Sequence, residues 1–380
     1  MVRYKLLTKP TQSGKTFSLL KHTTDILEDN PKAVHIILTD NSLIQLEQLF
    51  DRIVVVIGKG TMVLSSETDI SIDRLQKCIC ENKIKYILLC ANNAQITKIN
   101  KMIKTITRKC SGRSFYIWID EGDKIAEPEN ISIFDKWMDY NNIKGLAYIT
   151  ATPHSLILRY NKMFVLKVKE AYDKKRYNRW SDCKVITLPE REDYMTFIKD
   201  AFKKREAKKG DVWFIAPGNL TDTHEDVTRY LNGKGFYVLV VNALGELISP
   251  PKGKKFPLEG KNALSDRINY MYDNMNMYDK KFAIVGYNRL GRGITIQSNG
   301  MFITHAIFPT IPQNKASIYQ LAGRLCGNYK QYKGFKKPTI FCTEYFDDVA
   351  YELENVAIKI SKLPMIDKKI YNSLEKKYQR

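Results

Sequence analysis

Short apolar runs alternate with longer amphipathic segments through the first 155 residues. The runs are rich in Val and Ile and show little alternation with polar residues, which is typical of strands buried on both faces of a parallel sheet. Between two of them, Ser42–Phe50 places Leu46 and Leu49 on one side of a helical pattern. The pattern predicts a βαβ series and hence a mostly parallel α/β sheet. Its expected strands are Tyr4–Leu7, Val34–Leu38, Ile53–Ile57, Ile84–Cys90, Phe115–Ile119 and Leu146–Thr150.

A second series of the same kind begins near residue 184. Within it, residues 244–281 are long and basic and contain Pro and Gly, which predicts a surface excursion with a helix near 263–275. Its expected strands are Lys184–Thr187, Val212–Ala216, Phe236–Val241, Phe282–Gly286, Phe302–Phe308 and Thr339–Thr343.

The pattern is broken between the two series by a polar stretch. Tyr172, Tyr177 and Trp180 are interleaved there with Lys and Arg, so we interpret the stretch as a linker that could also contact nucleic acid. We therefore expect four parts: a first domain over residues 1–155, a linker over 156–183, a second domain over 184–346 and a helical tail over 347–380.

Composition narrows the class of protein. The chain has 380 residues, of which 44% are hydrophobic, enough for two domains with cores of their own. Lys and Arg number 61 against 41 Asp and Glu, and a net charge of +20 suggests a polyanionic partner such as nucleic acid, with a merely solvated basic surface as an equal alternative. No apolar run approaches the ~20 residues of a membrane helix, so a soluble intracellular protein is expected. The 7 cysteines include no CxxC, which predicts reduced thiols and no structural zinc.

A polar turn after the first expected strand leads into a helical pattern through Gly14-Lys15-Thr16. Backbone N–H groups at such a helix start can bind phosphate, and Gly14 permits close approach. Lys15 would reach the β- and γ-phosphates, and the Thr16 hydroxyl would ligate Mg²⁺. The pattern departs from G-x-x-x-x-G-K-[ST] at Lys9, and a turn that contains these three residues by chance is the alternative. The expected nucleotide-binding residues are Pro10, Thr11, Gln12, Ser13, Gly14, Lys15 and Thr16.

Two carboxylates follow the apolar run Phe115–Ile119. They fall at the C-terminal edge of the expected strand, where α/β sheets bind ligands. Asp120 would hold Mg²⁺, and Glu121 would orient or deprotonate the attacking water. We expect Asp123 to relay contacts between motifs.

The order and spacing of these motifs resemble a superfamily 2 helicase or translocase. Asp120-Glu121-Gly122-Asp123 resembles a variant of its DEAD/DEAH box, and Thr150-Ala151-Thr152 resembles motif III. In the second half, Leu290–Thr295 resembles motif V and Gln320–Arg324 resembles motif VI. The sequence around these last two motifs is similar to that of helicases of large DNA viruses and phages.

The resemblance implies two RecA-like domains, ATP and Mg²⁺ held between them, and a nucleic-acid strand crossing both. Arg324 would be an arginine finger and Gln320 would contact the γ-phosphate or its water. Thr150 and Thr152 would couple hydrolysis to strand binding. Gly291, Arg292 and Gly293 would contact the nucleotide. The expected strand contacts are Thr39, Asn41, Asn92, Asn93, Pro217, Gly218, Asn219, Asn242 and Thr295.

Some positions depart from the pattern of the family. Gly327 stands where motif VI usually has its last Arg, and Thr295 stands where DEAD-box proteins have Asp, which argues against that subfamily. Two other classes stay open: a nucleic-acid clamp or adaptor with a weak or decayed ATPase, and a DNA-packaging ATPase. The sequence does not distinguish DNA from RNA, and a monomer is the default for this architecture.

Overall fold

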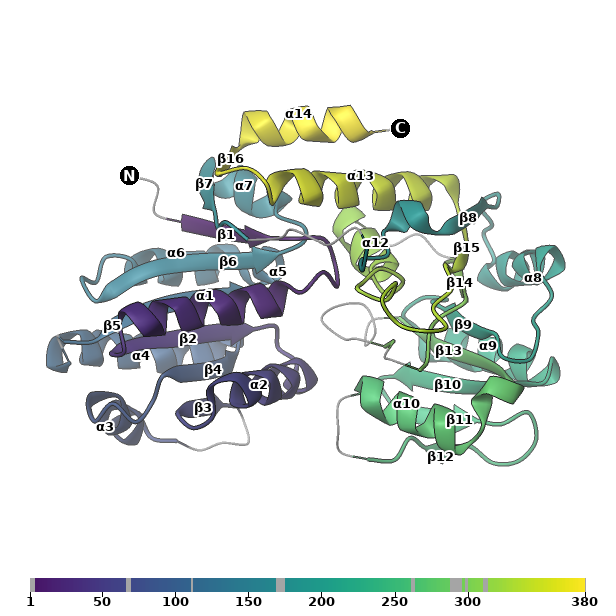
Figure 1. The fold of residues 1–380 in the computed structure, drawn as a ribbon, viewed down its shortest axis with the longest axis horizontal. Coiled ribbons are helices and arrows are strands. Elements are labelled where there is room, and N and C mark those ends of the chain that lie inside the picture. Colours follow the sequence, from purple (N-terminus) through teal and green to yellow (C-terminus); the bar gives the residue numbers. More distant parts are fainter. Residues whose placement is uncertain are drawn as a thin grey trace. The chain divides into compact units, whose positions relative to one another are not determined.

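The computed structural model describes residues 4–65, 70–110, 112–168, 175–260, 264–287, 296–297, 300–309 and 314–379. The chain forms two compact units, each built around a sheet with helices beside it (Figure 1). The first unit comprises Met1–Lys9, Gly14–Ala171 and Ala357–Leu374. The second comprises Pro10–Ser13, Tyr172–Val356 and Glu375–Arg380.

The first unit is built on a mostly parallel sheet. Its strands are β1 (Tyr4–Thr8), β2 (Ala33–Thr39), β3 (Thr61–Leu64), β4 (Tyr86–Cys90), β5 (Ser114–Asp120), β6 (Ile143–Thr150), β7 (Lys162–Val165) and β16 (Met365–Asp367). Their order in the sheet is β16-β7-β1-β6-β5-β2-β4-β3, and the β16–β7 pair is antiparallel. The helices of this unit are α1 (Lys15–Asp29), α2 (Leu43–Ile57), α3 (Ile72–Cys80), α4 (Asn93–Lys109), α5 (Gly122–Ile125), α6 (Pro128–Trp137), α7 (His154–Tyr160) and α14 (Lys368–Tyr378, which belongs to this unit up to Leu374).

Residues Ile53–Ile57 are helical, so the strand expected there is wrong. They form the end of α2, in which Leu46, Leu49 and Ile53 are buried at helical spacing, whereas Val55 is 84% exposed. A short run of β-branched residues does not by itself distinguish a strand from the last turns of a helix. The strand of this region is β3, which begins four residues after α2 ends.

The stretch expected as a linker, residues 156–183, contains secondary structure. Strand β7 lies in it and pairs with β1 on one side and with β16 on the other. Because β16 lies in the expected C-terminal tail, one edge of the first sheet is formed by these two segments. The idea that the aromatic residues here contact nucleic acid does not fit Tyr177 and Trp180, which are 0% and 1% exposed.

The second unit also has a largely parallel sheet. Its strands are β8 (Lys184–Thr187), β9 (Val212–Ile215), β10 (Phe236–Asn242), β11 (Gly245–Ser249), β12 (Phe256–Pro257), β13 (Lys281–Gly286), β14 (His305–Ile307) and β15 (Thr339–Cys342). The order is β12-β11-β10-β13-β9-β14-β15-β8, with β11 and β12 antiparallel. The helices are α8 (Tyr194–Lys204), α9 (Thr221–Gly233), α10 (Leu264–Asn274), α12 (Lys315–Ala322) and α13 (Glu344–Ile360, which belongs to this unit up to Val356), with 3₁₀ turns at Trp180–Asp182 and Met277–Asp279.

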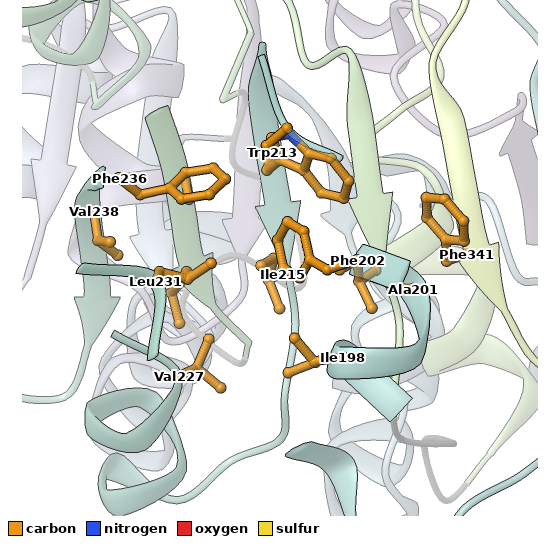
Figure 2. Packing of buried hydrophobic residues seen from close by; sticks show 14 of the residues in the cluster. Ile198, Ala201, Phe202, Trp213, Ile215, Val227, Leu231, Phe236, Val238 and Phe341 are labelled. Carbon is orange, nitrogen blue, oxygen red and sulfur yellow. The ribbon is translucent and has the colours of Figure 1, made fainter. Parts of the chain in front are cut away.

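The core of the second unit lies between its sheet and helices α8 and α9. Figure 2 shows Phe202 of α8 and Leu231 of α9 facing Trp213 and Ile215 of β9. Phe202 and Trp213 stack with ring centroids 4.6 Å apart. This burial of apolar surface is the main driving force that holds the two helices on the sheet. Helix α10 confirms the helix expected near residues 263–275.

Cys80 and Cys110 form a disulfide, which corrects the expectation that all thiols are reduced. The bond joins the last residue of α3 to the residue that follows α4, and the two cysteines are 30 positions apart in the sequence. No helix within the described residues is long and apolar enough to cross a membrane. The same residues contain no group of three or more His, Cys, Asp or Glu side chains placed to hold a metal ion.

Candidate functional site

Helix α1 begins at Lys15, directly after a residue with left-handed backbone. Gly14 has φ 85° and caps the helix without a side-chain hydrogen bond, so the first-turn N–H groups have no side-chain cap. The Ser18 amide donates to the Gly14 carbonyl at 3.0 Å. The Lys9 side chain is buried and donates to Ser18 Oγ at 3.3 Å. Lys9, which stands where the pattern G-x-x-x-x-G-K-[ST] has its first Gly, therefore adds a cation beside the start of α1.

The segment Pro10–Ser13 belongs to the second unit. The Thr11 amide donates to the Tyr319 hydroxyl at 3.3 Å, and the Tyr177 hydroxyl donates to the Thr11 carbonyl at 2.6 Å. Ser13 Oγ donates to the Pro10 carbonyl at 2.6 Å, and Gln12 has φ 55°. A Cβ at Gly323 would lie 2.4 Å from Thr11 Oγ1, so only Gly fits at that place of the Gly323-Arg324 pair.

Asp120 and Glu121 lie at the C-terminal end of β5, as expected. Asp120 is the last residue of the strand, and Glu121 has φ 51°, a left-handed conformation that is uncommon for a residue with a side chain. Glu121 is 5% exposed, and its amide donates to Asp120 Oδ1 at 3.1 Å. A Cβ at Gly122 would come within 2.9 Å of the Tyr148 ring, which explains the Gly in the third position of this motif.

Two cationic side chains lie near the Asp120 carboxylate. Burial raises the pKa of Asp120, and the nearby charges of Lys15 and Arg52 oppose this rise. Arg52 Nη1 donates to Thr16 Oγ1 at 3.3 Å. The phosphate-loop Lys, its neighbouring Thr and the first carboxylate therefore converge within the first unit, together with an Arg that the sequence did not single out.

Asp123 joins two motifs. Its carboxylate accepts from Thr150 Oγ1 at 2.7 Å and from Thr152 Oγ1 at 2.8 Å. The Thr152 amide also donates to Thr150 Oγ1 at 2.9 Å. The structure thus brings together three residues that the sequence assigned to contacts between motifs. Their coupling role is taken up below as a proposal.

The expected strand-binding residues of the first unit gather at the ends of β2 and β4, which are neighbours in the sheet. Asn92 caps α4 by accepting from the Gln95 amide at 3.0 Å, and its Nδ2 donates to Asn41 Oδ1 at 3.3 Å. Asn93 is exposed and Thr39 is 2% exposed. Carboxyl ends of parallel strands are where such sheets bind ligands.

In the second unit, the expected contacts follow β9 and end β10. Pro217 is buried, Gly218 has φ 130° and Asn219 is exposed. The Gly218 carbonyl contacts His224 Nε2 at 2.8 Å. Asn242 is 6% exposed, and its Oδ1 accepts from the Leu244 amide at 2.9 Å in the turn between β10 and β11. The side chain of Asn242 therefore also has a structural role in that turn.

Gln320 lies in α12 and Arg324 follows the helix. They are 2% and 3% exposed, and Arg324 Nε donates to the Gln320 carbonyl at 3.4 Å. Gln297 Nε2 donates to the Arg324 carbonyl at 2.8 Å. The remaining expected residues, Gly291, Arg292, Gly293 and Thr295, lie outside the described residues.

Solved structures provide the comparison that decides the fold. The chain is similar to Mss116p bound to ssRNA and AMP-PNP, with a TM-score of 0.52, 12% identity, and coverage of 93% of this chain and 69% of that one. It is also similar to S. cerevisiae Dbp5 bound to RNA and ADP BeF3, with a TM-score of 0.50, 12% identity, and coverage of 100% and 90%. The fold is two tandem RecA-like domains. This confirms the fold expected from the resemblance to superfamily 2 helicases.

A further solved structure is named as the DEAD-box helicase Mss116 bound to ssRNA and UDP-BeF. It has a TM-score of 0.48, 13% identity, and coverage of 99% of this chain and 79% of that one. No protein-family model matches the chain. No curated protein matches it either.

Arg52 is the residue that sequence reasoning missed. It lies on the exposed side of α2, one residue before the buried Ile53, and belongs to no motif. Its approach to Thr16 depends on the packing of α2 beside α1, so only the three-dimensional structure could identify it.

Proposed function

We propose that the chain is a nucleic-acid-dependent ATPase that acts as a helicase or translocase. The observation that carries this proposal is the convergence of Lys15, Thr16 and Asp120 within one RecA-like unit. The two similar structures described above contain RNA and an ATP analogue or ADP BeF3, which supports the same reading.

The residues of the first unit divide the work on the nucleotide. Lys15 and the first turn of α1 bind the phosphates, because a cation and free N–H groups at a helix start attract anions. Glu121 orients the attacking water, and its left-handed backbone sets the direction of that side chain. Gln320 and Arg324 keep the roles that the resemblance implies, a contact with the γ-phosphate or its water and an arginine finger.

Thr16 and Asp120 would hold Mg²⁺. Both offer the oxygen ligands that Mg²⁺ prefers, and both lie near the Arg52 guanidinium, so their oxygens occupy one neighbourhood. A dication there would favour the ionised form of the Asp120 carboxylate. When bound, the ion neutralises charge on the phosphate oxygens.

The strand of nucleic acid would follow the ends of β2 and β4. Asn41, Asn92 and Asn93 present polar groups there, and Thr39 is the last residue of β2. Contacts to phosphates give affinity without base specificity, and the net charge of +20 provides long-range attraction. Asp123, Thr150 and Thr152 would transmit the state of the nucleotide site to this edge, because they link the loop after β5 to the end of β6.

ATP hydrolysis measured with and without single-stranded RNA, single-stranded DNA or duplex tests the proposal. We expect stimulation by at least one polymer, and loss of hydrolysis in Lys15→Ala, Glu121→Gln and Arg324→Ala. Lys21→Ala is the matched control, because Lys21 is an exposed Lys on the same helix. Stimulation by none of the polymers would refute the motor function, and nucleotide binding without hydrolysis would indicate a clamp. Strand displacement then separates unwinding from translocation alone.

A further inference from the structure

Arg52 is held where it can act on the nucleotide site. Ile53 and Leu49 of α2 are buried in the same apolar cluster as Leu19 and Leu20 of α1, so the two helices are packed together. That packing places the base of the Arg52 side chain near the start of α1. The guanidinium donates from Nη1 to Thr16 Oγ1 at 3.3 Å.

The Arg52 guanidinium also interacts electrostatically with Asp120. Its positive charge interacts with the negative charge of the Asp120 carboxylate. The guanidinium thus interacts with the hydroxyl and the carboxylate that the proposed function assigns to Mg²⁺.

We propose that Arg52 is a nucleotide-binding residue that recognises the terminal phosphate of a nucleoside triphosphate. This inference rests on the proposed function and deepens it by naming a residue that distinguishes ATP from ADP. A dication at Thr16 and Asp120 would repel the guanidinium that bonds Thr16, so Arg52 must turn to another anion when Mg-nucleotide binds. The terminal phosphate is the anion that arrives with it.

The chemistry of arginine suits this role. Its planar fork of donors binds phosphate oxygens in pairs, whereas Lys15 acts as a single point charge. The Arg52 side chain is exposed while its head group contacts Thr16, so it can reorient without breaking the core. Its hydrogen bond to the neutral Thr16 hydroxyl at 3.3 Å can be exchanged for bonds to phosphate oxygens.

Binding of fluorescent ATP and ADP, followed by anisotropy without nucleic acid, tests the inference. We expect Arg52→Ala to weaken ATP binding about 10- to 100-fold, the range for a lost hydrogen bond to a charged group. ADP binding should change by less than about threefold, since ADP lacks the recognised group. Arg52→Lys should restore part of the lost ATP affinity. The larger effect of Arg52→Ala on ATP binding than on ADP binding should persist in EDTA. Arg74→Ala, which removes an exposed Arg from α3, is the matched control.

The outcomes separate this inference from the proposed function. Unchanged ATP affinity in Arg52→Ala, or an equal loss of affinity for ATP and ADP, would overturn the inference. Nucleotide binding by the wild-type protein would still support the proposed nucleotide site. A lower Mg²⁺ requirement in Arg52→Ala without loss of ATP affinity would show that Arg52 only competes with the ion, and this also overturns it. Wild-type protein that binds neither nucleotide would refute both. Thermal unfolding of each variant, with Arg52→Gln as a second substitution, separates lost binding from lost folding.

Discussion

The carboxylate of Asp123 accepts a hydrogen bond from the hydroxyl of Thr150 at 2.7 Å. Asp123 follows β5 and Thr150 ends β6, and these strands are neighbours in the first sheet. A second hydroxyl, that of Thr152, donates to the other oxygen of the same carboxylate at 2.8 Å. The contact therefore joins the acidic motif to the next motif through side chains alone.

Thr150→Val should break this link while keeping the shape of the side chain. Thr150 is fully buried, so the change leaves polar groups of Asp123 and of the Thr152 amide without their partner. We expect a loss of about 1–3 kcal/mol in the free energy of unfolding, measured by urea denaturation, and weaker stimulation of ATP hydrolysis by nucleic acid. Thr150→Ser keeps the hydroxyl and is the control. Full stimulation in a folded Val variant would contradict the coupling role.

Gly122→Ala should destabilise the first unit. The new Cβ would lie 2.9 Å from Tyr148 Cδ1 and 3.0 Å from its Cβ, and Tyr148 is fully buried between its neighbours. Overpacking of this kind costs about 1–3 kcal/mol, which thermal or urea unfolding would detect. Gly233→Ala is the comparison, because no atom lies within 4 Å of its added Cβ. Equal stability of the two variants would show that the loop after β5 can shift freely.

Acid should weaken the first unit through His35. This side chain is fully buried, and burial lowers its pKa from 6.5 to about 3. The Trp118 indole N–H can only donate and lies 3.0 Å from His35 Nδ1, so protonation of that nitrogen would break the bond.

Because the folded state binds fewer protons than the unfolded state, the contribution of His35 is fully present above pH 6.5 and is lost as the pH falls toward about 3. We expect His35→Gln, which retains an acceptor for Trp118, to show a shallower fall in the free energy of unfolding between pH 7 and pH 4. The difference in slope should approach ~1.4 kcal/mol per pH unit. Parallel curves for the two proteins would refute the assignment.

Arg179→Met should destabilise the second unit strongly. Arg179 Nε donates to Glu354 Oε2 at 3.3 Å, and the Glu354 side chain is fully buried. Removal of the cation leaves a buried carboxylate that only the Trp180 amide still bonds among these groups, at 2.9 Å. Such a loss typically costs about 3–5 kcal/mol.

The control for this pair is Arg191→Met, which removes an exposed cation that lies 3.0 Å from Asp200. Surface pairs contribute about 0–1 kcal/mol. A second test adds Glu354→Gln to Arg179→Met, which should recover part of the stability because the buried charge is gone. Equal effects of the Arg179 and Arg191 substitutions on urea unfolding would contradict the role of the buried pair.

Much of the sheet architecture follows from local pattern. The runs Val34–Leu38 and Phe236–Val241 lie within strands β2 and β10, because continuous apolar β-branched residues fit a sheet covered on both faces. The same rule fails at Ile53–Ile57, where only the turn of the helix separates the buried Ile53 from the exposed Val55. This rule also did not predict strands β7 and β16, because β7 has only four residues and β16 only three, and β16 forms the edge of the sheet beside β7.

Part of the candidate site, like part of the fold, could be predicted from local sequence patterns. Runs of neighbouring residues in the chain identify the phosphate loop and the acidic motif, because a strand end, a turn and a helix start are local features. No local pattern predicts contacts between residues that are distant in the sequence. Arg52 and Thr16 are 36 positions apart, and Asp123 and Thr152 are 29 positions apart. These contacts arise because parallel strands and their connecting helices bring remote turns to one edge of the sheet, and the order of strands that does so is set by packing across the whole unit.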